Sequence, residues 1–173
     1  MTVGTETIVL RGLIGQDRDR ARAMIEATSV FRPAEVDIAL EVFDGATTSP
    51  DEDYLGLGAY EDDRLIGFTL YGPTPGTEST WALYWIVVDP SGQHHGVGRR
   101  LMEDTERAIG AAGGRLIVVE TSSRSDYAPA RAFYRALQYE QSARIPDYYA
   151  EQDDLIVYTK RLSPPITEIG DHG

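Results

Sequence analysis

The spacing of apolar positions divides the chain into amphipathic helices and short strands. Apolar residues recur three and four positions apart in four segments, 17–28, 33–43, 97–112 and 128–137. Alternating or continuous apolar runs of strand length occupy the segments around them, 7–11, 55–60, 65–71, 81–88, 116–120, 139–145 and 155–161. The predicted order is β-α-α-β-β-β-α-β-α-β-β, an α/β (α+β) fold with a mixed central sheet flanked by helices.

Turn and breaker residues support these boundaries. Pro33 suits the first turn of a helix, and Gly113-Gly114 ends the helix over 97–112. The acidic turn at residues 61–63 separates two strand-like runs and predicts a hairpin. Residues 72–76, which contain two prolines and two glycines, are predicted to form a loop. The near-continuous apolar run at 116–120 is typical of a strand that is buried on both faces.

Length and composition are those of one ordinary globular domain. The chain has 173 residues, no Cys, 42% apolar residues and 25% charged residues. We expect a single domain over residues 1–162 and a flexible C-terminal tail over 163–173. No run is long enough to span a bilayer, and the N-terminus lacks the pattern of a signal peptide, so we expect a cytoplasmic protein.

The charge is acidic and unevenly distributed. The formal net charge is −12, which disfavours nucleic-acid and membrane partners and favours cations, including protonated amines. Ten acidic residues and no Lys or Arg lie between positions 33 and 63: Glu35, Asp37, Glu41, Asp44, Asp51, Glu52, Asp53, Glu61, Asp62 and Asp63. This segment is interpreted either as a solvated face or as a field that steers a cationic ligand.

The strand over 81–88 runs through a glycine-punctuated turn directly into the helix over 97–112. Gly96 and Gly98 permit close backbone approach, and the first helical turn leaves N–H groups that favour an anion such as a pyrophosphate. A P-loop is excluded because Gly98 is followed by Arg99 rather than by Lys and Ser or Thr. The dinucleotide fingerprint is excluded because its third glycine is absent.

Two motifs resemble those of the GNAT family of acetyl-CoA-dependent N-acetyltransferases. Gln93-x-x-Gly96-x-Gly98 resembles the family's acetyl-CoA-binding signature, and the segment 130–139, ARAFYRALQY, resembles its second conserved segment. The likeness covers most of residues 55–162. The chain departs from the family pattern at Tyr127, where Asn is common, and at Gln138, where Gly is usual.

The resemblance implies how acetyl-CoA is bound. The pyrophosphate would contact backbone N–H groups of the turn, and the pantetheine arm would pair with the end of the strand over 81–88, like an added strand. A backbone N–H near Val88 would polarise the acetyl carbonyl. The predicted cofactor-binding residues are Val87, Val88, Gln93, His94, His95, Gly96, Val97, Gly98 and Arg99.

The resemblance also implies catalytic roles. Tyr134 matches the family tyrosine that donates a proton to the CoA sulfur, and an ordinary tyrosine pKa of ~10 keeps it protonated. Glu120 ends the predicted buried strand, where a carboxylate is costly unless it is paired or used, and its position is similar to that of the catalytic glutamate of ribosomal-protein N-terminal acetyltransferases. Alternatively, Glu120 simply emerges at the solvent end of the strand. The base is therefore Glu120 or a chain of water molecules.

Other chemistries are less consistent with the sequence. His94 and His95 lack metal-ligand partners at helical spacing, so we expect no metal site. The absence of Cys excludes a thioester enzyme intermediate, which leaves direct attack in a ternary complex. The predicted function is acetyl transfer to a primary amine, with a catalytically silent acyl-CoA-binding module as the alternative.

The acceptor is the part that the sequence defines least. We expect a cationic small molecule or a peptide N-terminus, and a homodimer is left open. The predicted walls of its site are residues 17–28, 33–43, 72–80 and 146–154. Residues 146–149, PDYY, are similar to the aromatic pair of N-terminal acetyltransferases, or they are a hairpin connection whose tyrosines cover the core.

Overall fold

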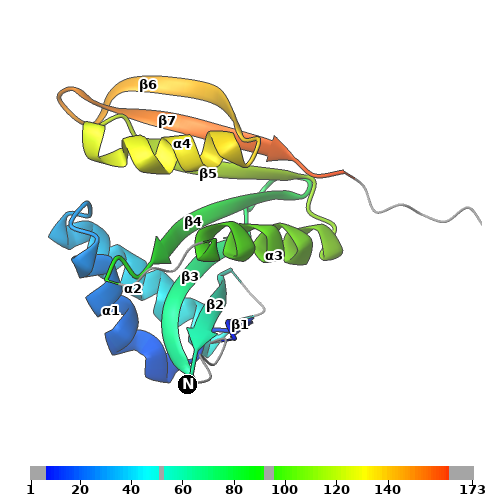
Figure 1. Ribbon diagram of the computed structural model, residues 1–173. Coiled ribbons are helices and arrows are strands. Elements are labelled where there is room, and N and C mark those ends of the chain that lie inside the picture. Colours follow the sequence, from blue (N-terminus) through cyan, green and yellow to red (C-terminus); the bar gives the residue numbers. More distant parts are fainter. Residues whose placement is uncertain (1–6, 51–52, 92–95, 164–173) are drawn as a thin grey trace, which may run out of the picture.

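A computed structural model describes residues 7–50, 53–91 and 96–163. Its centre is one seven-stranded sheet with the spatial order β1-β2-β3-β4-β5-β7-β6 (Figure 1). The strands are β1 Val9–Gly12, β2 Leu55–Glu61, β3 Arg64–Pro73, β4 Thr80–Val88, β5 Leu116–Ser122, β6 Glu140–Ala150 and β7 Asp153–Arg161. The helices are α1 Arg18–Ala27, α2 Pro33–Thr48, α3 Val97–Ala111 and α4 Ala128–Ala136, with short 3-10 turns at Gly15–Asp17 and Ser125–Tyr127. The predicted order of elements and the mixed sheet are confirmed.

Several elements are longer than predicted, because tertiary contacts extend them. Helix α2 continues to Thr48, since Ala46 carries its buried stripe one turn beyond Phe43. The predicted loop over 72–76 is wrong at its start, where Gly72 and Pro73 belong to β3 and pair with β4. Gly72 is required there, because a Cβ would lie 2.1 Å from the backbone oxygen of Asp53.

The helices cover opposite faces of the sheet. Helices α1 and α2 pack against one face, where Phe43 meets Phe68 edge to face in a core that also contains Leu70 and Val87. Helix α3 covers the opposite face of the strands β2, β3 and β4, and α4 covers that face of β5 and β7. The Thr69 and Thr105 hydroxyls form a buried hydrogen bond of 2.8 Å between β3 and α3. The sheet therefore separates an α1–α2 face from an α3–α4 face.

The middle of the sheet splays open. Strands β4 and β5 are the parallel pair, and they pair only from Thr80–Leu116 to Leu83–Val119. Beyond this point β4 continues for five residues and β5 for three, and the two strands diverge (Figure 1). Every other neighbouring pair is antiparallel. The opening joins the two faces of the sheet at the end of β4, just before the turn that leads into α3.

Within the described ranges, no helix is both long enough and apolar enough to cross a membrane. The predicted tail over 163–173 lies outside the described residues except for its first residue.

Candidate active site

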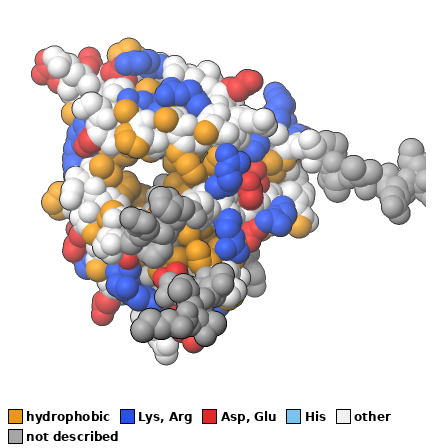
Figure 2. Space-filling view, viewed as in Figure 1, with side chains coloured by type: hydrophobic (Ala, Val, Ile, Leu, Met, Phe, Trp, Pro, Cys, Tyr) orange, Lys and Arg blue, Asp and Glu red, His pale blue; other side chains and the backbone are white. Residues whose placement is uncertain are grey.

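A cleft of about 1200 Å³ occupies the opening between β4 and β5. Figure 2 shows an opening between the two parts of the molecule, bordered by hydrophobic side chains. Its walls come from β4, β5, the start of α3, α4, β6 and the connection between α1 and α2. Of the residues predicted for the site, those that line it are Val87, Val88, Gly96, Gly98, Arg99, Glu120 and Tyr134. The fold thus brings together residues that are far apart in the sequence.

The start of α3 faces this cleft. Gly96 is the N-cap residue and has a φ of 78°, a conformation that favours glycine. The Arg100 amide donates to the Gly96 carbonyl at 3.0 Å, so the amides of residues 97–99 precede the regular hydrogen bonds of the helix. Val97 is fully buried against the sheet. Gln93, His94 and His95 lie outside the described residues.

Gly98 lines the cleft as predicted for a binding residue, and it also has a packing role. A Cβ on Gly98 would lie 3.3 Å from the Phe133 ring and 3.7 Å from the side chain of Val88. The missing side chain therefore lets the first turn of α3 approach α4, whereas the sequence suggested only space for a phosphate.

Asp89, which follows β4, fixes the beginning of the turn that leads to α3. Its buried carboxylate accepts hydrogen bonds from the Ser91 amide at 2.9 Å and from the Ser91 hydroxyl at 2.7 Å, and it is paired with Arg20 of α1. Burial opposes ionisation, but the hydrogen bonds from Ser91 and Arg20 outweigh it and lower the pKa of Asp89 to about 2. Asp89 is therefore ionised at neutral pH.

Tyr134 points from α4 into the core beside the cleft. Its side chain is 7% exposed, and its ring packs near the rings of Phe133, Tyr139 and Tyr158. Burial, and to a smaller extent the neighbouring Tyr127, raises the pKa of Tyr134 above the ordinary tyrosine range. The phenol consequently stays protonated throughout the neutral range, as a proton donor must.

Glu120 lies in β5 and not at its end, which corrects the sequence interpretation. The strand continues to Ser122, and the side chain of Glu120 is exposed because β4 has diverged from β5 at this level. The argument from a costly buried carboxylate is therefore wrong. Ile117 and Val119 pack with Tyr134, so the alternation of the strand directs Glu120 to the opposite face of the sheet, the face on which α1 and α2 pack against β3 and β4.

Aromatic rings and a second carboxylate form the cleft wall on the α1–α2 face. Phe31 meets Tyr127 edge to face, with their ring centroids 6.2 Å apart, and both line the cleft with Glu35. Burial, followed by the charge of Glu35, raises the pKa of Tyr127 to about 12. No local pattern in the sequence marks Phe31 as a cleft residue, and Glu35 stands out only as one of ten acids. The position of Glu35 three residues after Arg32 is typical of a helix start rather than of a ligand site.

The two tyrosines near the C-terminus belong to β6 rather than to a hairpin connection. Tyr148 and Tyr149 are 54% and 36% exposed, so the interpretation that they cover the core is wrong. Tyr149 lines the cleft. Burial and then the charge of Glu120 raise the pKa of Tyr149 above its usual range. Tyr149 and Glu120 therefore line the same cleft, although β7 lies between their strands.

The acidic segment is partly neutralised by arginines from elsewhere in the chain. Asp44 pairs with Arg18 at 2.7 Å, and Asp63 pairs with Arg11 at 3.2 Å. Asp51 and Glu52 lie outside the described residues. Of the described members, Glu35 lines the cleft. The steering field is consequently weaker than a count of the ten acids suggests.

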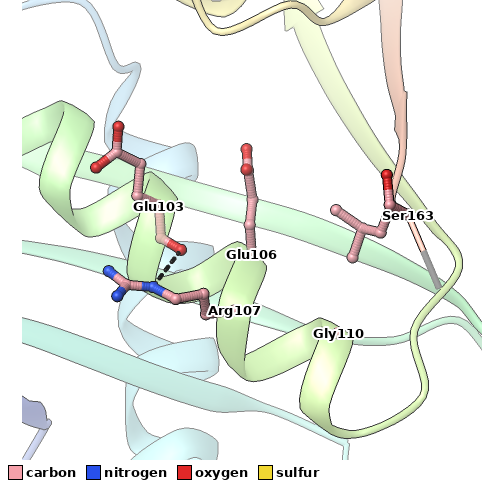
Figure 3. A pocket seen from close by; sticks show the side chains of 6 residues that line it. Glu103, Glu106, Arg107, Gly110 and Ser163 are labelled. Carbon is pink, nitrogen blue, oxygen red and sulfur yellow. Dashed lines mark hydrogen bonds between the residues drawn. The ribbon is translucent and has the colours of Figure 1, made fainter. Parts of the chain in front are cut away.

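A smaller hollow of about 530 Å³ lies along the second half of α3 (Figure 3). Its carboxylates are engaged within the protein, because Glu106 accepts hydrogen bonds from Lys160 at 2.9 Å and from the Tyr139 hydroxyl at 3.0 Å. Arg107 donates to the carbonyl of Glu103. The hollow therefore lacks the open hydrogen-bonding groups of the main cleft. Among the described residues, no three His, Asp or Glu side chains are grouped so as to hold a metal ion.

Comparison with known proteins agrees with this geometry. The model of the acetyltransferase (GNAT) family matches residues 21–139, which is more than half of the chain. An uncharacterized protein of Mycobacterium leprae is 32% identical over 152 residues, which cover 86% of this chain. The chain spans only 39% of that relative's length.

Solved structures share the whole fold. A protein from Desulfovibrio desulfuricans, described as an acetyltransferase of the GNAT family, is 36% identical, with a TM-score of 0.85 and coverage of 91% of this chain and 100% of that chain. An acetyltransferase-like protein from Salmonella typhimurium, solved with its cofactor acetyl-CoA, is 17% identical, with a TM-score of 0.71 and coverage of 92% and 96%. At that identity, the second likeness shows the fold alone.

Proposed function

Because the chain belongs to the acetyltransferase (GNAT) family, as its sequence motifs predicted, we propose that it transfers the acetyl group of acetyl-CoA to a primary amine by direct attack in a ternary complex. The observation that carries this proposal is the cleft that passes between β4 and β5 and joins two chemically different faces of the sheet. One substrate enters from each face, and the two meet in the opening.

Acetyl-CoA binds on the α3–α4 face. The free amides of the first turn of α3 and the positive end of its dipole hold the pyrophosphate, and Arg99 adds charge at the rim of the cleft. The small side chain of Ala130 and the close packing of Gly98 against Phe133 shape the groove between α3 and α4. Beyond Leu83, the edge of β4 that faces β5 has no strand partner, and the pantetheine arm pairs with it.

The chemical step uses groups from both sides of the opening. The amine nitrogen attacks the thioester carbon, and the backbone N–H of Val88 stabilises the oxyanion that develops. The carbon–sulfur bond then breaks, and Tyr134 donates its phenolic proton to the departing sulfur. Glu120 lies on the acceptor face and removes the proton of the ammonium group, either directly or through water molecules.

The acceptor is a cationic amine. Three carboxylates line the cleft, Glu35, Glu120 and Asp126, and Asp126 is paired with Arg124. Among the ion pairs formed by described residues, none includes Glu35 or Glu120. Two carboxylates without an ion-pair partner, in a cleft that the rings of Phe31 and Tyr127 also line, are suited to an ammonium group, which both charge and aromatic faces attract.

Release of the CoA thiol with a panel of primary amines tests this function. We expect acetyl-CoA to bind without an acceptor, and we expect thiol release and acetylated product to require a cationic primary amine. Alcohols and carboxylates of matched size serve as negative controls. Binding of acetyl-CoA without turnover for any amine would instead indicate a silent acyl-CoA-binding module.

A further inference from the structure

A buried carboxylate beside the cleft joins the connection between α1 and α2 to the strands β5 and β7. Asp153, the first residue of β7, is 4% exposed, and each of its carboxylate oxygens has a partner. One oxygen accepts a hydrogen bond from the Arg32 guanidinium at 2.9 Å, and the other accepts a hydrogen bond from the Ser122 hydroxyl. Arg32 precedes α2 and is separated from Asp153 by 121 positions in the chain.

Two further contacts fasten the same connection between α1 and α2, residues 28–32. The Arg124 guanidinium donates to the Val30 carbonyl at 2.7 Å while it also pairs with Asp126. Between these bonds, Phe31 packs on Tyr127. The connection is thus held at three successive residues, Val30, Phe31 and Arg32, against residues that follow β5 or begin β7.

These contacts cross the region where the sheet itself is open. Strands β4 and β5 no longer pair beyond Leu83 and Val119, so their hydrogen bonds do not fix the width of the cleft there. The connection places Val30 and Phe31 in the cleft wall. The backbone N–H of Arg32 donates to the carboxylate of Glu35 at 2.6 Å, so Arg32 links Asp153 directly to a cleft carboxylate.

We propose that Asp153 is a positioning residue for the acceptor: acting through Arg32, it holds Phe31 and Glu35 at the distance from Glu120 that the amine requires. This proposal rests on the proposed function. The pyrophosphate site is built on the start of α3, which none of these bonds includes, and α4 is joined to them only where Arg131 donates to the carbonyls of Ser122 and Arg124. Loss of the Asp153 charge therefore affects recognition of the amine and leaves the binding of acetyl-CoA unchanged.

Asp153→Asn tests the proposal, because it keeps the shape of the side chain and removes the charge that holds Arg32. We expect the KM for the amine to rise about tenfold, while the dissociation constant of acetyl-CoA, measured by calorimetry without acceptor, stays within about twofold. Glu106→Gln is the matched control, since that part-buried carboxylate pairs with Lys160 at 2.9 Å and lines the smaller hollow rather than the cleft. It should leave both constants unchanged.

A second variant covers the case in which Asp153→Asn fails to fold. Arg32→Met removes the same bond from its 45% exposed partner and should raise the amine KM to a similar extent. In the double variant the two effects should not add, because they break one bond. Unchanged amine KM in the folded variants, or an equal loss of acetyl-CoA affinity, would overturn the positioning role alone. Absence of amine turnover in the wild-type protein would overturn the proposed function, and this role with it.

Discussion

The two faces of the sheet contribute different chemical groups to one cleft. The α3–α4 face offers backbone amides, Gly96 and Gly98, with a buried Tyr134 behind them, whereas the α1–α2 face offers rings and the carboxylates Glu35 and Glu120. Under the proposed function, the pyrophosphate of the donor is bound by backbone N–H groups. Their position depends on the path of the main chain and not on the identity of the surrounding side chains. A wall made of side chains from several elements can change residue by residue without changing the fold. Substitutions in the cleft wall can therefore change the acceptor without changing the site proposed for acetyl-CoA.

The largest predicted effect separates chemistry from binding on the donor side. Tyr134→Phe should lower kcat by roughly 10²-fold or more, because the thiolate then leaves without its proton donor. The affinity for acetyl-CoA should not change, since the hydroxyl acts only as the bond breaks. Tyr139→Phe is the control: that ring packs beside Tyr134, but its hydroxyl bonds Glu106 outside the cleft. A near-normal kcat in Tyr134→Phe would mean that Tyr134 is a core packing residue and not the proton donor.

Asp89 and Asp153 are both buried aspartates, but Asp89 holds the turn that leads to α3, whereas Asp153 holds Arg32 before α2. Substitution of Asp89 should have the next largest effect, on the free energy of unfolding. Its pKa of about 2 lies below the usual 3.8, so its ionisation stabilises the folded state fully above pH 4, and this contribution is lost as the pH falls towards 2. Asp89→Asn should therefore lower the free energy of unfolding by about 2 kcal/mol at pH 7. Denaturant titrations at several pH values should show the two proteins converging towards pH 2. A difference that stays constant over this range would mean that packing, not charge, causes the loss.

A smaller effect tests the contact between α3 and α4. Gly98→Ala places a methyl group 3.3 Å from the Phe133 ring and should weaken acetyl-CoA binding about tenfold as the first turn of α3 shifts. Gly110→Ala in the same helix meets no atom within 4 Å among the described residues. It should stabilise the protein by roughly 1 kcal/mol through helix propensity and leave the affinity unchanged. Equal affinities in the two variants, measured by calorimetry, would contradict the role of Gly98.

The smallest effect concerns the charge on the α1–α2 face. Raising the salt concentration should lower kcat/KM for a cationic amine a few-fold, because carboxylates near the cleft increase the rate of capture. The value of kcat should stay nearly flat, since bond making does not depend on the distant field. The Arg18 and Arg11 pairs of Asp44 and Asp63 reduce this field. A kcat/KM that does not vary with salt would leave the acidic segment as a solvated face.

The sequence located the turn between β4 and α3 better than the cleft wall around Glu35 and Glu120, and the reason is physical. The turn between β4 and α3 is a local motif, and the order of elements follows from local periodicity, so both could be predicted. The pairing of Arg32 with Asp153 and the approach of Tyr149 to Glu120 depend on long-range packing, which no local pattern encodes. The sequence left open whether Glu120 is buried or exposed, because its exposure follows from the divergence of β4 from β5.

A crystal structure with CoA and an acetylated amine product would show whether the two substrates enter the cleft from opposite faces. We expect the pyrophosphate at the first turn of α3, the sulfur beside Tyr134, and the acetylated nitrogen in the opening, with the rest of the amine between Glu35 and Glu120 on the α1–α2 face. An amine that enters from the α3–α4 face, or a CoA that does not contact the start of α3, would contradict it.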